Sequence, residues 1–345
     1  MIKTLLGRTN IEVCKDAFGA LPIQRCNMEE AVKILQKALD GGINFFDTAR
    51  GYSDSEEKIG NAISHRRKEF FIATKTHASN AENFFKELDT SLEKLKTDYI
   101  DVYQIHNPGH VPRPGGDGGV YDAALEAKAQ GKIRFIGISN HKLPLAIEAV
   151  ESGLYDTLQF PFSYLSNEEE IKLVKLCQEK NVGFIAMKAL SGGLITDIFA
   201  ARAWMTQFTN VVPIWGIQRE GELDELLQAM KSEPGLTKEQ NAQIEKDKAE
   251  LGGDFCRGCG YCLPCPVGIP INLSARMSLL IKRSPTARLI TPERQEIMAR
   301  IENCTQCGHC RDNCPYDLEP TELLKKNYEW YKEFINLGAE RRGQT

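Results

Sequence analysis

Two groups of residues in this chain have types and spacings that could do chemistry. In the first group, single polar residues come at the end of short apolar runs or just after them, and these residues are Asp47, Tyr52, Lys75 and His106. The second group consists of cysteines, four in FCRGCGYCLPCPVG (residues 255–268) and four in CTQCGHCRDNCP (residues 304–315). A carboxylate, a phenol, an ammonium and an imidazole that meet could move protons, and grouped thiolates bind soft metals.

The cysteine spacing predicts iron–sulfur clusters. The first run is Cys256, Cys259, Cys262 and Cys265, and the second is Cys304, Cys307, Cys310 and Cys314. The second run, followed by Pro315, matches the C-x2-C-x2-C-x3-C-P pattern of bacterial 4Fe-4S proteins, and the first is one residue shorter before its last cysteine. Two four-cysteine zinc sites are the alternative, although zinc sites tend to pair two C-x2-C units from separate places.

The second domain resembles a helical two-cluster ferredoxin, because the segments between and after the cysteine runs have helical patterns. In paired-cluster ferredoxins the fourth cysteine of each run binds the other cluster. That resemblance implies one cluster on Cys256, Cys259, Cys262 and Cys314, and another on Cys304, Cys307, Cys310 and Cys265. Such crossing would tie the two ends of a small domain together.

The elements that must position the first group alternate between strand and helix. We expect eight strands, at DAFGALP (16–22) and at residues 43–47, 70–75, 99–106, 133–139, 157–162, 183–188 and 211–217. Amphipathic helices lie between them, and the first is capped by Asn27 with Glu30 three residues later. This count and length predict a (β/α)8 TIM barrel, whereas the rival doubly wound sheet usually carries a G-x-G-x-x-G turn that is absent.

Catalytic residues of such barrels come from the carboxyl ends of strands. Asp47, Lys75 and His106 end three successive predicted strands, and Tyr52 follows the first of these. We therefore expect the four side chains to meet at one end of the barrel.

The string NFFDTARGYSDSEEKIG, with FIATK and DVYQIHN after it, resembles the aldo-keto reductase family over residues 2–232. The resemblance implies a catalytic tetrad of Asp47, Tyr52, Lys75 and His106. A tyrosine with a pKa near ~10 protonates a substrate oxygen slowly at neutral pH unless a cation favours its phenolate, and Lys75 would be that cation. Asp47 would hold Lys75, and His106 would orient the substrate carbonyl.

The same resemblance implies a nicotinamide cofactor, NADP or NAD. The implied contacts are Ser139, Asn140, Gln159, Phe162, Leu190, Gly192, Gly216, Gln218, Arg219 and Glu225. Arg219 corresponds to a contact with the 2'-phosphate and favours NADP. Leu226 stands where the family often has an asparagine that contacts adenine, so the choice between NADP and NAD stays open.

Composition sets the wider limits. The 345 residues with a net charge of −4 show no basic face, which argues against a nucleic-acid partner. No apolar run approaches the ~20 residues of a membrane span, and the amino terminus lacks the apolar core of a secretory signal, so we expect a cytoplasmic protein. We expect a barrel over 1–232, a helical connector over 233–252 and a cluster domain over 253–345. The Pro- and Gly-rich segment 107–119 is either a substrate lid or a mobile surface loop.

Three functions are compatible with these motifs. The first is a nicotinamide-dependent oxidoreductase acting on a small-molecule carbonyl or alcohol, with clusters of structural or electron-transfer role. The second is an electron-transfer protein that couples the clusters to a protein partner or to an unrecognised flavin. The third is a non-catalytic redox sensor, in which Tyr52 would have no task. Substrate and oligomeric state are not predictable from the sequence.

Overall fold

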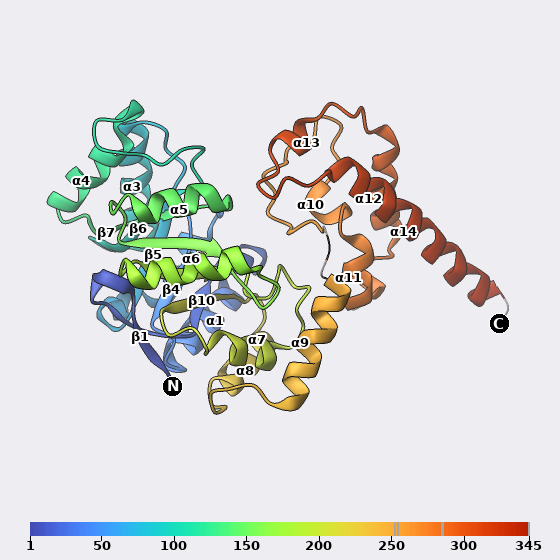
Figure 1. Cartoon of the computed structure of the whole chain (residues 1–345), viewed down its shortest axis with the longest axis horizontal. Coiled ribbons are helices and arrows are strands. Elements are labelled where there is room, and N and C mark those ends of the chain that lie inside the picture. The colour runs from blue at the N-terminus through green and yellow to red at the C-terminus, as the bar shows by residue number, and fades with distance from the viewer. Residues whose placement is uncertain (252, 254, 284–285, 344–345) are drawn as a thin grey trace. The chain divides into compact units, whose positions relative to one another are not determined.

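The structure of the protein, a computed structural model, describes residues 1–251, 253, 255–283 and 286–343. The chain divides into two compact units, drawn with their elements in Figure 1. The first comprises Met1–Leu190 and Asp197–Ile244, and the second comprises Ser191–Thr196 and Glu245–Thr345. The domain boundaries expected at 232 and 252 stay predictions, and residue 252 lies outside the described residues.

Eight parallel strands of the first unit close into a barrel, as predicted. They are β3 (Ala17–Gly19), β4 (Phe45–Asp47), β5 (Phe71–Thr76), β6 (Ile100–His106), β7 (Ile133–Ser139), β8 (Thr157–Pro161), β9 (Gly183–Met187) and β10 (Val211–Gly216). The barrel closes because β10 pairs in parallel with both β9 and β3. Apolar side chains dominate these strands because parallel strands are covered on both faces.

Eight helices follow the barrel strands in the order expected for a (β/α)8 fold. They are α1 (Met28–Asp40), α2 (Ser55–Ile63), α3 (Ala81–Leu95), α4 (Val120–Ala129), α5 (Leu143–Glu151), α6 (Glu168–Glu179), α7 (Ile198–Met205) and α8 (Glu220–Ala229). At α1 the predicted capping box is present: Asn27 Oδ1 accepts from the Glu30 N–H at 2.9 Å, and Glu30 Oε2 accepts from the Asn27 N–H at 3.1 Å.

A hairpin that the sequence did not predict precedes the barrel. Its strands are β1 (Lys3–Leu5) and β2 (Glu12–Cys14), which pair antiparallel around the 3-10 helix η1 (Gly7–Thr9). Buried Leu6 and Ile11 from this hairpin share one hydrophobic cluster with Phe45, near the start of β4, and with Ala17 at the start of β3. The hairpin therefore packs on the barrel end opposite the carboxyl ends of the strands.

The second unit is helical, as predicted, and no strand occurs in its described residues. Its helices are the end of α9 (Lys238–Leu251), α10 (Ile271–Ser274), α11 (Met277–Arg283), α12 (Pro292–Ala299), α13 (His309–Asp312) and α14 (Pro320–Gly343). Further 3-10 helices in the chain are η2 (Pro22–Arg25), η3 (Ser64–Glu69), η4 (Asp117–Gly119), η5 (Thr286–Arg288) and η6 (Arg300–Asn303). The core of this unit includes Met277, Met298 and Leu324, and Cys262 and Cys310 are also among its buried residues. Across the described part of the chain, no helix combines the length and apolar character that a membrane crossing requires.

Candidate active site

Three neighbouring strands of the barrel carry the predicted catalytic residues at their carboxyl ends. Asp47 is the last residue of β4, Lys75 is the next-to-last of β5 and His106 is the last of β6. These strands are adjacent in the barrel, which brings their ends together. Tyr52 lies in the turn between β4 and α2 and is half-buried.

Asp47 and Lys75 form a buried ion pair. Lys75 Nζ lies 2.9 and 2.7 Å from the two carboxylate oxygens of Asp47, and the side chains are 1% and 2% exposed. The ammonium also donates to the Thr48 carbonyl at 2.6 Å, so three acceptors surround it. Burial lowers the pKa of Lys75 and raises the pKa of Asp47, and in each case the partner's opposite charge acts against the shift.

Two glutamines from other strands donate hydrogen bonds to the carboxylate of this ion pair. Gln104 Nε2 donates to Asp47 Oδ1 at 3.2 Å, and Gln159 Nε2 donates to Asp47 Oδ2 at 3.4 Å. Hydrogen bonds of this kind favour the ionised carboxylate and fix its orientation. The carboxylate can therefore hold the Lys75 ammonium in one place.

Tyr52 lies beside both the ammonium and an imidazole. Lys75 Nζ is 5.3 Å from the centroid of the Tyr52 ring. The rings of Tyr52 and His106 meet edge to face, with centroids 6.0 Å apart and an interplanar angle of 81°. A phenol, a cation and an imidazole are thus gathered around one point, as the sequence predicted.

His106 is neutral at physiological pH. Its pKa lies well below the ordinary value because the ring is buried and because Lys75, His77 and His141 add positive charge nearby. Its Nδ1 is buried and has no hydrogen-bond partner among the described residues. A neutral imidazole carries one N–H, which can donate to a substrate oxygen without adding a second charge.

Sequence reasoning missed two residues of this site, Gln104 and His77. The His77 ring stacks on His106 with centroids 4.0 Å apart and an interplanar angle of 29°, and burial lowers its pKa. Gln104 precedes His106 by two positions and His77 follows Lys75 by two. Since side chains two apart in a strand share a face, this spacing was the signal that could have found both.

The predicted nicotinamide contacts lie at the ends of β7 and β8. Ser139 Oγ accepts from the Asn107 N–H at 3.1 Å, and Asn140 Nδ2 donates to the Pro108 carbonyl at 3.1 Å. The Gln159 amide nitrogen is bonded to Asp47, whereas its Oε1 is buried with no partner in the described residues. That oxygen is an acceptor suited to the N–H of a carboxamide.

Phe162 lies in an aromatic cluster. Its ring is 1% exposed and contacts the rings of Phe184, Trp204 and Phe208 at centroid distances of 5.6, 5.1 and 5.1 Å. The structure therefore shows this ring in the packing between barrel and helix α7.

The remaining predicted contacts lie around β10 and the loop after β9. Glu222 Oε2 accepts from the N–H groups of Gln218 and Arg219 at 2.9 and 3.1 Å, which caps α8. The Arg219 side chain is 60% exposed, and its Nε lies 3.7 Å from Glu222 Oε1. Gly216 is the last residue of β10, and Glu225 is exposed on α8. Leu226, which follows Glu225, is buried in the hydrophobic core. Leu190 ends a segment of the first unit, whereas Gly192 belongs to the second unit.

The segment 107–119 is anchored to the barrel. Tyr155 donates from its hydroxyl to the Pro112 carbonyl at 2.6 Å, and Arg113 pairs with Glu148 on α5 at 2.9 Å. With the Asn140 bond to Pro108 at 3.1 Å, the segment is held at three separate points.

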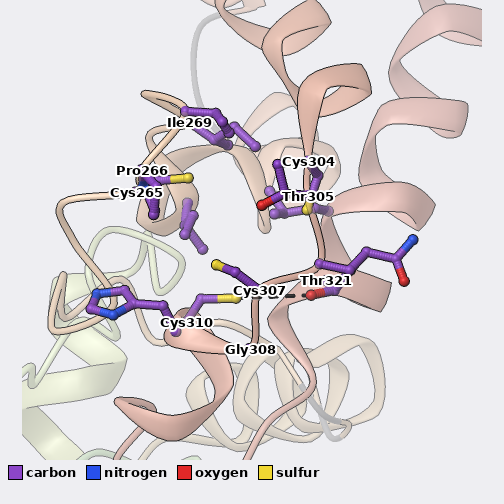
Figure 2. Close-up of a pocket in the computed structure, with 14 residues that line it drawn as sticks. Cys265, Pro266, Ile269, Cys304, Thr305, Cys307, Gly308, Cys310 and Thr321 are labelled. Carbon is purple, nitrogen blue, oxygen red and sulfur yellow. Dashed lines mark hydrogen bonds between the residues drawn. The ribbon is translucent and has the colours of Figure 1, made fainter.

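In the second unit, four cysteines line one cavity (Figure 2). They are Cys265, Cys304, Cys307 and Cys310. Cys265 comes from the first cysteine run and the others from the second, so the runs meet as the crossed pairing requires. Cys310 Sγ lies 3.8 Å from Thr321 Oγ1 of α14. No three His, Cys, Asp or Glu side chains in the described residues have the compact arrangement that a single metal ion needs.

The first run has its own backbone support. The Gly258 N–H lies 3.3 Å from Cys256 Sγ. Hydrogen bonds to sulfur are among the features that tune iron–sulfur clusters. All eight cysteines of the two runs are free of disulfide bonds.

An eight-stranded parallel barrel with this polar group at the carboxyl ends of its strands defines a TIM-barrel enzyme. The family model "Aldo/keto reductase family" matches residues 17–202, more than half of the chain, and the chain belongs to this family of oxidoreductases. A model described as a 4Fe-4S dicluster domain matches residues 255–319.

Several known proteins are similar to part of this chain. The uncharacterized oxidoreductase YqkF of Bacillus subtilis is 29% identical over 211 residues, which are 57% of this chain and 67% of that protein. The L-galactose dehydrogenase of Arabidopsis thaliana is 30% identical over 211 residues, 56% of this chain and 66% of the relative. The chain thus spans about two thirds of these relatives' length.

Solved structures share the fold. The aldo-keto reductase AKR11C1 from Bacillus halodurans, in its holo form, aligns with a TM-score of 0.63 and 24% identity, over 72% of this chain and 96% of that one. An aldo-keto reductase from Klebsiella pneumoniae in complex with NADPH aligns with a TM-score of 0.61 and 23% identity, over 71% of this chain and 95% of that one. At this level of identity, the similarity shows that these proteins share the barrel fold.

Proposed function

We propose that the chain is an NADP(H)-dependent oxidoreductase that interconverts a small-molecule carbonyl and its alcohol, with Tyr52 as general acid. The observation that carries this proposal is the buried Asp47–Lys75 pair, whose ammonium lies 5.3 Å from the Tyr52 ring. A fixed cation beside a phenol favours the phenolate, and this lowers the barrier to proton transfer from the hydroxyl.

The residues at the ends of β7 and β8 fit a nicotinamide. The buried Gln159 Oε1 has an open acceptor position among the described residues, and a carboxamide N–H would satisfy it. Ser139 and Asn140 lie on the adjacent strand end, and the exposed Arg219 side chain favours a 2'-phosphate, hence NADP over NAD. Bound NADPH would supply a hydride to the carbonyl carbon, and bound NADP⁺ would accept one from an alcohol. The similarity to an NADPH complex from Klebsiella pneumoniae agrees with this assignment.

The chain's own residues then have separate tasks. Tyr52 donates its hydroxyl proton to the carbonyl oxygen during reduction and takes it back during oxidation. Lys75 stabilises the phenolate left behind, and Asp47 holds Lys75 in place with the help of Gln104 and Gln159. Neutral His106 donates its N–H to the same substrate oxygen and orients it.

The second domain would hold two 4Fe-4S clusters on eight thiolates. The dicluster family match and the cavity lined by four cysteines support this cargo. One cluster would take Cys265, Cys304, Cys307 and Cys310, and the other Cys256, Cys259, Cys262 and Cys314. Bound clusters would stabilise a domain with a small core, and they could pass electrons to a partner protein.

The proposal is tested with Tyr52→Phe in protein that contains its full iron. NADPH oxidation is followed with a panel of small aldehydes and ketones, and NADPH affinity is measured by fluorescence titration. We expect turnover to fall by roughly 10²–10⁴-fold while the dissociation constant for NADPH stays the same. Tyr99→Phe is the matched control and should keep full activity, because Tyr99 directly precedes β6 and so lies at the end of the strand opposite His106. Unchanged turnover in Tyr52→Phe would contradict the proposal, and an inactive wild type across the whole panel would favour the redox-sensor alternative.

A further inference from the structure

A threonine hydroxyl in the second unit lies against one of the predicted cluster ligands. Thr321, the second residue of helix α14, has its Oγ1 3.8 Å from Cys310 Sγ, and Figure 2 shows this contact as a dashed line. Both residues line the cavity that is also lined by Cys265, Cys304 and Cys307. Sulfur is larger than oxygen, so a hydroxyl can donate to it across this distance. The contact therefore places a hydrogen-bond donor inside the predicted cluster site.

The state of the cysteine decides which of the two atoms donates. A free Cys310 thiol could donate its S–H to the Thr321 hydroxyl or accept from it. A cysteine that binds iron does so as a thiolate, which has no proton to donate. The Thr321 hydroxyl is then the donor, and a hydrogen bond to a charged acceptor is stronger than one between neutral groups.

Helix α14 is anchored beyond Thr321, so the hydroxyl has a fixed position. Leu324, three positions further and on the same face of the helix, is 1% exposed and belongs to the core of the second unit. Asn327 accepts from the Ser278 N–H of α11 at 2.9 Å and donates to the carbonyl of Ala275, directly after α10, at 2.9 Å. These contacts hold the helix to its neighbours without using the Thr321 hydroxyl.

The acceptor side of the contact is fixed and shielded from water. Cys310 is the second residue of the short helix α13 and is 8% exposed. The apolar side chains of Ile269, Ile271 and Leu324 line the same cavity. In such surroundings a dipole is screened less than in water, so one hydroxyl has a larger effect on the charge carried by the sulfur.

We propose that Thr321 raises the reduction potential of the cluster that Cys310 binds, by donating its hydroxyl hydrogen to the Cys310 thiolate. The inference rests on the proposed cluster cargo and not on the carbonyl chemistry of the barrel. Reduction adds one electron from an external donor, breaks no bond and leaves the hydroxyl its proton. The added negative charge is shared by the iron-bound sulfurs, so the hydroxyl dipole stabilises the reduced state more than the oxidised state.

The inference is the same for both ways of sharing the cysteines between clusters. Cys310 is a ligand whether the fourth cysteine of its cluster is Cys265, as in crossed pairing, or Cys314, as in uncrossed pairing. In either case Thr321 contacts only one of the two proposed clusters through this hydrogen bond. The other cluster therefore serves as an internal reference in the same molecule.

The test measures both cluster potentials in the whole chain, by anaerobic titration with dithionite followed by electron paramagnetic resonance. Iron and acid-labile sulfide are determined on each sample. The variants are Thr321→Val, which keeps the shape of the side chain without the hydroxyl, Thr321→Ser, which keeps the hydroxyl, and Thr305→Val. Thr305 lines the same cavity and is the matched control, since in the described part of the chain no hydrogen bond joins its hydroxyl to a cysteine sulfur.

At equal iron content we expect Thr321→Val to make the reduction of one cluster about tenfold less favourable, which lowers its potential by about 59 mV for one electron. Thr321→Ser and Thr305→Val should keep the wild-type potentials, and the second cluster should shift much less in every variant. Wild-type potentials in Thr321→Val would overturn the inference. An equal shift in Thr321→Ser would also overturn it, because packing and not the hydroxyl would then be the cause.

Iron retention decides the remaining cases. If Thr321→Val does not keep its iron, Thr321→Ala is titrated in its place. Loss of iron from both variants would mean that the side chain is needed to hold the cluster and not to tune it, which contradicts the inference. A wild-type protein that contains no iron and no sulfide after anaerobic purification would instead refute the proposed cluster cargo.

Discussion

At the scale of single residues, the site depends on a buried pair of opposite charges. Asp47 and Lys75 are both almost completely buried, so each charge is costly without the other. The pair is compensated locally by Gln104, Gln159 and the Thr48 carbonyl. Such a pair contributes little net stability compared with an apolar pair, but it places a cation beside Tyr52, which an apolar pair could not do.

This arrangement predicts a large cost for removing one partner. In Lys75→Met the Asp47 carboxylate is left buried without its cation, and we expect the free energy of unfolding to fall by about 3–5 kcal/mol. The double variant Asp47→Asn/Lys75→Met should recover part of the lost free energy of unfolding. The single variant Lys75→Met and the double variant should both be inactive as reductases. Denaturant titration of the intact protein measures the change. The exposed pair Lys33–Glu29 supplies the control, and Lys33→Met should leave stability unchanged. Equal effects of the two substitutions would show that Asp47 is not held as a carboxylate.

The sequence predicted the positions of Asp47, Lys75 and His106 because each ends an apolar strand, and barrel chemistry gathers at such ends. It did not predict that Gln159 donates to Asp47 at 3.4 Å, since one amide can serve either a carboxylate or a cofactor. The sequence also did not predict that the His77 ring stacks on the His106 ring with centroids 4.0 Å apart. Contacts of this kind depend on side-chain rotamers and not on residue spacing.

At the scale of elements, the eight barrel strands were predictable because they are short apolar runs separated by amphipathic helices. The β1–β2 hairpin was not, because strands of three residues such as KTL and EVC are too short to show an alternating pattern. The sequence also did not predict that residues Ser191–Thr196 belong to the second unit. In that unit the Gly192 and Leu194 carbonyls accept hydrogen bonds from Arg276 and Arg283, which lie 84 and 89 residues further along the chain.

The hairpin makes a testable contact with the barrel through Gly7. Gly7 has a φ of +54°, and a Cβ added there would lie 2.2 Å from the Gly183 backbone nitrogen at the start of β9. Backbone cannot move aside as a flexible side chain can, so Gly7→Ala should destabilise the barrel by about 2–5 kcal/mol, from left-handed strain plus overpacking. Gly131→Ala is the matched control, since Gly131 has a φ of +74° and nothing within 4 Å of the added Cβ.

Gly131→Ala should therefore cost only the conformational strain, about 1–2 kcal/mol. The comparison uses denaturant unfolding of the two variants and of wild type, with the same slope m required for all three. Equal losses for Gly7→Ala and Gly131→Ala would mean that the hairpin can shift away from β9 at no cost, and that it does not close the barrel end.

At the scale of the whole molecule, a barrel enzyme carries a helical unit whose core contains cysteines. Cys262 and Cys310 lie in the same hydrophobic cluster as Met277 and Leu324. In a unit of this size, metal binding adds stability that a small apolar core does not supply. The way the cysteine runs share the clusters therefore matters for how the unit folds, and crossed sharing would join residues near its two ends.

Crossed ligation makes a prediction that single substitutions cannot settle but double substitutions can. Cys265 lines one cavity with Cys304, Cys307 and Cys310, so Cys265→Ala and Cys304→Ala should damage the same cluster. The double variant should then keep about half of the wild-type iron and sulfide, as each single variant does. Cys265→Ala with Cys256→Ala should instead lose nearly all of both, because those residues would serve different clusters.

If each run bound its own cluster, the two double variants would exchange results. Cys265→Ala with Cys304→Ala would lose nearly all iron, and Cys265→Ala with Cys256→Ala would keep half. Iron and acid-labile sulfide are measured on anaerobically purified protein, with Cys177→Ala as the control for loss of a buried thiol outside the runs. Because Cys265 and Cys304 lie 39 positions apart in sequence and line the same cavity, we expect the crossed result, in which each cluster staples the first run to the second.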